Sequence, residues 1–96
     1  MVFKKIYAKK LKNYTKIGGV NRDKTRHQKS HLLLGQNIRQ IRESKKLSQE
    51  ELGFRIKSAR NYIGCIERGE KSPSLDIIFD IALALNCNVC EFFEKI

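Results

Sequence analysis

The chain has 96 residues and a formal net charge of +10, from 20 basic and 10 acidic side chains. This length suits one small domain, so we expect no attached ligand-binding or cleavage domain. No apolar run reaches the length of a signal peptide or a membrane span, and we expect a soluble cytoplasmic protein.

The excess charge is concentrated near the N-terminus. Residues 1–30 hold ten Lys or Arg residues and one acid, Asp23, whereas residues 31–96 are nearly neutral. We therefore predict a flexible basic arm over residues 1–30 and a compact domain over residues 31–96. The arm is a solvated tail, an overlong translation start, or a segment that contacts phosphates without reading sequence. A further alternative is a basic amphipathic helix on DNA or an anionic membrane, with an apolar side formed by Phe3, Tyr7, Leu11 and Tyr14.

The first predicted helix of the compact domain contains Leu34, Ile38 and Ile41. Their spacing of four and then three residues places the three side chains on one side of a helix. We expect that side to face the core.

The segment from 47 to 69, LSQEELGFRIKSARNYIGCIERG, is typical of two short helices joined by a tight turn. Ser48 and Glu51 have the spacing of a capping box, which would begin the first of these helices. Gly69 suits the left-handed residue that ends the second. Such a pair forms a helix-turn-helix, whose second helix enters the DNA major groove with its N-terminal side chains at base edges.

Two more helices are predicted after residue 73. Ser74 begins the first of these helices, and Asn86 ends it as a left-handed residue. One side of this helix carries a stripe of apolar residues that we expect in the core. Asn88 and Glu91 repeat the capping-box spacing for a last short helix. The predicted core stripe comprises Leu75, Ile78, Ala82 and Leu85. No stretch alternates in the manner of a strand, so we predict an all-α fold with five helices and no sheet.

The helix after Ser74 carries apolar residues beyond that stripe, namely Ile77, Phe79, Ile81 and Leu83. They either thicken a small core or form an exposed patch that marks a partner. We favour the patch and predict a two-fold homodimer, which would place two recognition helices about 34 Å apart on a palindromic operator. The predicted interface comprises Leu83, Phe92, Phe93 and Ile96.

The stretch from Leu34 to Glu94 resembles the Cro/repressor-type helix-turn-helix regulators, also called the xenobiotic response element family. The resemblance rests on three segments: GQNIRQIRESKKLSQEEL, YIGCIERGEKSPSLD and IALALNCNVCEFF. Within that family, RNYIGCIERGEKSPSLD resembles the controller proteins of restriction–modification systems. The resemblance implies a compact, lambda-repressor-like domain of five helices, and a buried ion pair between Arg42 and Glu67 that braces the first helix against the third.

The turn departs from the family pattern at three positions. Lys57 stands where the family usually has glycine, at a place that requires positive φ. Ser58 replaces an apolar turn residue, and Ala59 replaces the usual serine cap of the recognition helix. Ser58 is an alternative cap, which would move the start of that helix by one residue.

Roles at the DNA follow from the recognition helix. We assign base contacts to Arg60 and Asn61, since Arg suits guanine and Asn suits adenine, and to Cys65 against a thymine methyl. Gln49 is expected to hold a phosphate with its side chain and backbone N–H. The other predicted phosphate contacts are Tyr62, Arg68, Lys71 and Ser72, with Lys45 and Lys46 as weaker candidates. For each residue the alternative is a solvated surface position.

No metal, cofactor or catalytic set is predicted. Cys87 and Cys90 form a C-x-x-C motif, but Cys65 stands alone and no second pair completes a zinc site. We expect structural or incidental thiols, with a redox switch as the alternative. The chain has no Gly-rich phosphate loop and no Ser-His-Asp set, so we expect no enzyme.

We therefore predict an autoregulatory, sequence-specific transcriptional regulator that binds double-stranded DNA as a homodimer, with no membrane partner and no small-molecule ligand evident. The alternatives are an antitoxin that represses its own operon, and an RNA-binding or protein-adaptor module. The operator and the sign of regulation do not follow from the sequence.

Overall fold

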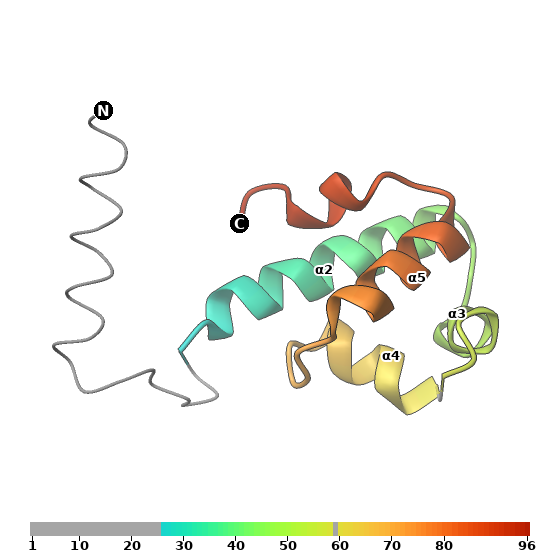
Figure 1. Ribbon diagram of the computed structural model, residues 1–96, viewed down its shortest axis with the longest axis horizontal. Helices are drawn as coiled ribbons and strands as arrows, with labels where there is room; N and C mark the ends of the chain where they lie inside the picture. Colours follow the sequence, from blue (N-terminus) through green and yellow to red (C-terminus); the bar gives the residue numbers. More distant parts are fainter. Residues whose placement is uncertain (1–25, 59) are drawn as a thin grey trace, which may run out of the picture.

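Four α-helices and one 3-10 helix make up the protein in a computed structural model that describes residues 26–58 and 60–96 (Figure 1). In chain order they are α2 (Gln28–Ser44), α3 (Gln49–Arg55), α4 (Arg60–Glu67), α5 (Leu75–Leu85) and η1 (Val89–Phe93). The described residues contain no strand. The predicted all-α fold is confirmed, with η1 as the short last helix.

The helix ends lie at the residues that the sequence marked. Ser48 Oγ accepts a hydrogen bond from Glu51 N at 3.0 Å, and Glu51 Oε1 accepts one from Ser48 N at 3.3 Å. The same reciprocal capping box begins η1. Ser74 Oγ accepts from the third residue of α5, and left-handed residues follow α5 at Asn86 and α4 at Gly69, with φ of 50° and 73°. Local hydrogen bonding therefore sets the lengths of α3 and α5.

Helix α2 begins at Gln28, three residues before the predicted domain boundary at residue 31. Residues 28–30, which the sequence analysis assigned to the arm, are therefore helical. The rest of the arm prediction, over residues 1–25, lies outside the described residues.

Each helix contributes to one hydrophobic core. Helix α4 and the C-terminal η1 pack against α2, which runs the length of the described domain, whereas α3 packs against α4 and α5 (Figure 1). All of the core side chains are at most 7% exposed. The core comprises Leu34, Ile38, Leu52, Ile63, Ile66, Ile78, Ile81, Ala82, Leu85 and Phe92.

The predicted register of α5 and one predicted interface residue are wrong. Leu75 is 67% exposed although we expected it in the core stripe, and Ile81 is fully buried although we counted it as surplus. Nearly every residue of α5 is apolar, so more than one stripe satisfies a helical period and the pattern does not choose among them. Phe92 has no exposed surface and fills the centre of its own protomer, so it does not belong to a dimer interface.

Helices α2 and α4 approach each other closely at Gly35. A Cβ atom there would lie 2.4 Å from the carbonyl oxygen of Ile66 and 2.5 Å from that of Glu67. These carbonyls belong to the last turn of α4, so the missing side chain lets α2 contact the end of α4 directly. This contact sets how deeply the helix-turn-helix sits against α2.

Asn37 holds the C-terminal segment against α2. Its Nδ2 donates to the carbonyl oxygens of Phe92 and Glu94, both at 2.9 Å. These bonds and the buried Phe92 ring fix the end of the chain on the domain. No helix within the described ranges is long and apolar enough to cross a membrane.

Replacement of Gly35 by Ala is expected to lower the free energy of unfolding by about 1–3 kcal/mol, because the new methyl group overlaps backbone atoms that cannot move aside. Thermal and urea unfolding followed by circular dichroism measure the change. Gln36→Ala, at an exposed position of the same helix, is the matched control and should stay within about 0.5 kcal/mol. Equal stability of Gly35→Ala and wild type would show that α2 and α4 do not pack this closely.

Candidate nucleic-acid interface

Helices α3 and α4 are joined by a turn with one left-handed residue. Lys57 has φ of 56°, and Ser58 N donates to Gly53 O at 2.7 Å as the chain leaves α3. The positive φ at Lys57 agrees with the glycine that the family usually has there. Ala59 lies outside the described residues, so the choice of cap for α4 stays open. The geometry of two short helices and a tight turn is that of a helix-turn-helix.

Helix α4 buries one side and exposes the other. Ile63 and Ile66 lie in the core, whereas Asn61 is exposed and Cys65, one turn later, is half-buried. Asn61 and Cys65 therefore share a side of the helix. The side chain of Arg60, the other predicted base contact, lies outside the described part of the chain. Of the three predicted base contacts, Asn61 and Cys65 lie on the same outward-facing side of α4.

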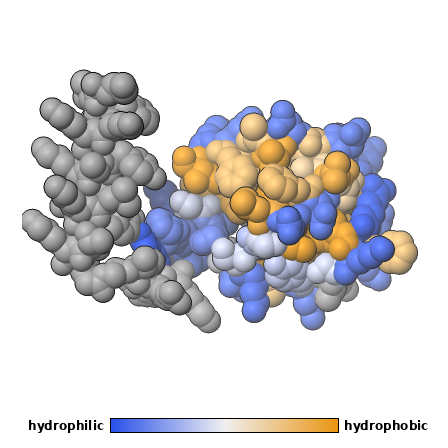
Figure 2. All heavy atoms as spheres, in the orientation of Figure 1, coloured by the Kyte–Doolittle hydropathy of each residue, from blue (hydrophilic) through white to orange (hydrophobic). Residues whose placement is uncertain are grey.

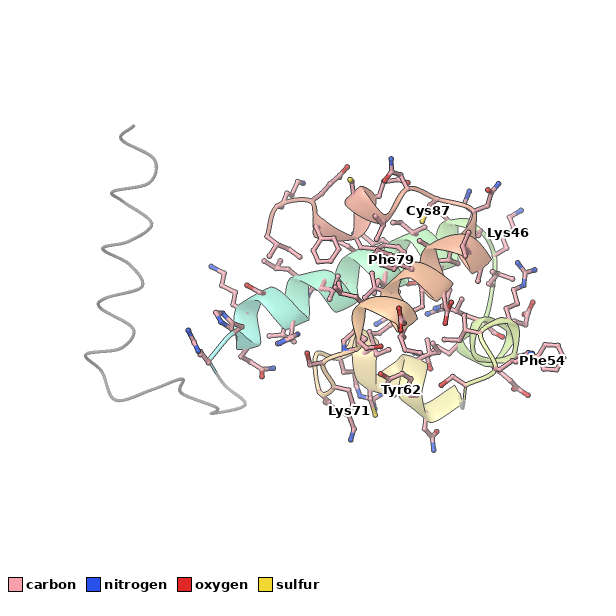
Figure 3. All side chains as sticks on the ribbon, in the orientation of Figure 1. Lys46, Phe54, Tyr62, Lys71, Phe79 and Cys87 are labelled. Carbon is pink, nitrogen blue, oxygen red and sulfur yellow. The ribbon has the colours of Figure 1, made fainter. Side chains whose placement is uncertain are left out.

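The predicted phosphate contacts lie at two separate places. Figure 3 shows Tyr62 and Lys71 on the side of the domain where α4 lies, whereas Lys46 lies at the far end of α2. The Tyr62 ring is half-buried against the core, and Lys71 and its neighbour Ser72 are exposed. Lys45 and Lys46 are exposed in the α2–α3 connection.

Arg68 is paired within its own loop. Its Nε and Nη2 donate to the carboxylate of Glu70 at 3.0 and 3.1 Å, and Nη2 lies 3.7 Å from Cys65 Sγ. The bonds to Glu70 raise the pKa of Arg68, and the same bonds lower the pKa of Glu70. The pair is exposed and screened by water, so it stabilises the fold little. A phosphate that binds Arg68 through both Nε and Nη2 has to replace Glu70.

The predicted ion pair between α2 and α4 is present and buried. Arg42 Nε donates to Glu67 Oε2 at 2.6 Å and Arg42 Nη2 donates to Glu67 Oε1 at 3.1 Å. The carboxylate raises the pKa of Arg42 by hydrogen bonding, which outweighs the effect of burial. A third nitrogen, Nη1, donates to Leu47 O at 2.6 Å, just before the cap of α3. The Arg42 guanidinium, which projects from α2, therefore contacts both the end of α4 and the residue that precedes the cap of α3.

Gln49 contacts the same carboxylate and is partly buried. Its Nε2 donates to Glu67 Oε1 at 2.9 Å, across 18 residues of sequence. The predicted phosphate contact of Gln49, through its side chain and backbone N–H, stays a prediction, and in the structure its side-chain amide is bonded to Glu67. The sequence also gives no sign of the close contacts at Gly64, where a Cβ would lie 3.0 Å from Arg68 Nη1 and 3.4 Å from Gln49 Oε1. No local pattern indicates either contact, because both depend on how α3 crosses α4.

The thiols do not form a metal site in the described ranges, where no group of three or more His, Cys, Asp or Glu residues converges. Cys87 is half-buried, and burial raises the pKa of its thiol. Cys90 is exposed. A raised pKa makes Cys87 less reactive at neutral pH, which favours the structural interpretation over the redox switch.

The fold and the exposed side of α4 define a helix-turn-helix DNA-binding domain. The helix-turn-helix family model HTH_3 matches residues 38–92. The chain belongs to this family and is a transcriptional regulator with a DNA-binding domain of that type.

Two similar proteins are named control proteins, and one similar solved structure is that of a restriction–modification controller protein. Control protein C.BamHI of Bacillus amyloliquefaciens is 53% identical over 55 residues, which are 56% of this chain and 68% of that protein. Control protein C.SmaI of Serratia marcescens is 39% identical over 63 residues, covering 66% and 75%. The crystal structure of the restriction–modification controller protein C.AhdI of Aeromonas hydrophila matches with a TM-score of 0.63 and 40% identity. It covers 65% of this chain and 94% of that one. These relatives agree with the controller-protein resemblance of the sequence.

Replacement of Arg42 by Met is expected to lower the free energy of unfolding by about 3–5 kcal/mol, because it leaves the Glu67 carboxylate buried without its main partner. Chemical unfolding measures this loss. Arg39→Met removes the exposed partner of Glu43 from the same helix, and should cost less than about 1 kcal/mol. Equal effects of the two variants would contradict the role of the buried pair.

Proposed function

We propose that the protein is an autoregulatory transcription factor that binds a palindromic operator upstream of its own gene as a homodimer. The observation that carries the proposal is the exposed side of α4, with Asn61 at its N-terminal end and Lys71 in the loop beyond its C-terminal end. In a helix-turn-helix this side enters the major groove, and its first residues reach base edges. Two relatives are named control proteins, which supports the regulatory role.

The base contacts are assigned to Arg60 and Asn61, with Cys65 one turn further along the groove. An asparagine side chain pairs with adenine N6 and N7, and arginine pairs with guanine O6 and N7. Lys71 and Ser72 are assigned to the phosphates that flank the groove, and Tyr62 beside them contributes its hydroxyl. Such contacts place the protein on the duplex without distinguishing sequences.

The proposed dimer uses the apolar surface of α5 and the C-terminal segment. Leu75, Phe79 and Leu83 are 67%, 49% and 80% exposed and recur every four residues on one side of α5. Phe93 and Ile96 are 45% and 49% exposed beyond η1. Figure 2 shows apolar side chains gathered over this part of the molecule. Water-exposed apolar area of this kind favours association with a second copy.

The first test titrates the purified protein against DNA from upstream of its own gene and against random duplex, at about 0.15 M salt. We expect a preference of roughly 10³-fold or more for the upstream DNA. Asn61→Ala should lose about 1–3 kcal/mol on that DNA and relax one base position, whereas Lys71→Ala should weaken both duplexes alike. Unchanged sequence preference in Asn61→Ala would contradict the assigned docking.

Leu83→Glu is expected to weaken dimerisation by roughly thirtyfold, about 2 kcal/mol, because it places a charge in an apolar interface. Sedimentation equilibrium measures the dissociation constant. Glu50→Gln, a charge change at an exposed position of α3, is the control. Since Leu83 is 80% exposed, the thermal unfolding of the protomer should stay close to wild type. A dissociation constant that does not change would exclude Leu83 from the interface.

A further inference from the structure

The Glu67 carboxylate is enclosed by donors from two other helices. Its side chain is 2% exposed. Oε2 accepts from Arg42 Nε at 2.6 Å, and Oε1 accepts from Arg42 Nη2 at 3.1 Å and from Gln49 Nε2 at 2.9 Å. The two bonds from the planar guanidinium hold the carboxylate in one orientation. Glu67 is therefore a fixed point to which the Gln49 amide is attached.

The bond from Gln49 closes the helix-turn-helix at the side opposite its turn. Gln49 is the first residue of α3 and Glu67 is the last residue of α4. The turn joins the end of α3 to the beginning of α4, so the hydrogen bond joins the two remaining ends. Two links at opposite ends restrict the angle between two helices more than one link does. The Gln49 side chain lies over Gly64 of α4, where a Cβ would be 3.4 Å from Gln49 Oε1.

We propose that Gln49 is a positioning residue for sequence readout: through Glu67 it holds α4 at the angle at which α4 reads bases. The inference rests on the proposed function and assigns Gln49 a different role from a phosphate contact. Hydrogen bonds to base edges weaken steeply with misalignment, so the angle of α4 affects specific binding above all. Binding to random duplex depends on phosphates and charge, which the angle changes little.

The test compares Gln49→Met with wild type on two probes: a duplex that wild type enriches from a randomised library, and random duplex. Methionine keeps the length of the side chain and removes its donor. We expect the ratio of the two affinities to fall roughly tenfold, in line with the loss of a hydrogen bond to a charged group. Affinity for random duplex and its dependence on salt should match wild type. Gln40→Met, at an exposed position of α2, is the matched control and should leave both probes unaffected.

A second variant, Gln49→Glu, places a carboxylate beside Glu67. We expect it to lower the affinity ratio further, because repulsion displaces the start of α3 from the end of α4. Both variants keep the Arg42–Glu67 pair, and circular dichroism checks that each remains folded at the temperature of binding.

Equal losses on the two probes would overturn the inference, because that result describes a phosphate contact. An unchanged ratio and unchanged affinities would overturn it as well. A wild-type protein that enriches no sequence would contradict the proposed function and remove the inference with it. If wild type is selective and Gln49→Met loses the same affinity on both probes, the inference is overturned and the proposed function stands.

Discussion

The Glu67 carboxylate is buried inside a small domain. The arrangement of α2, α3 and α4 depends on the hydrogen bonds and the ion pair that stabilise this buried charge. A buried ion loses several kcal/mol of hydration, which close partners have to offset. Arg42 supplies two of those partners and Gln49 the third. No buried side-chain nitrogen or oxygen in the described ranges is without a hydrogen-bond partner. Since an ion pair of this kind tolerates little displacement, α2, α3 and α4 have one favourable arrangement.

The parts of the fold that the sequence predicts are the local ones. The Ser48–Glu51 capping box and the left-handed Asn86 depend on residues at most four apart, and the structure has both. The pairing of Arg42 with Glu67 spans 25 residues, and only a family resemblance indicated it. Local patterns carry no information about which helix crosses which, so such contacts need either an analogue or a structure.

The errors have the same physical origin. Helix α5 is apolar on nearly all sides, so its period does not identify the side that faces the core, and the predicted positions of Leu75 and Ile81 are wrong. Phe92 is apolar and near the end of the chain, which suits an interface as well as a core. Only the position of η1, held by Asn37 from across the domain, places that ring inside. Among candidate site residues, Gln49 has a partner in Glu67, 18 residues away, that its neighbours in sequence do not reveal.

The left-handed Lys57 has a consequence for the exposure of the chain to proteases. A side chain in that conformation costs about 1–2 kcal/mol, which glycine would avoid. Its presence makes the unfolded fraction roughly tenfold larger at equilibrium than a strain-free turn would. Proteases that cleave the unfolded chain act in proportion to that fraction. Strain in a single turn therefore enlarges the share of unfolded chain that is open to cleavage.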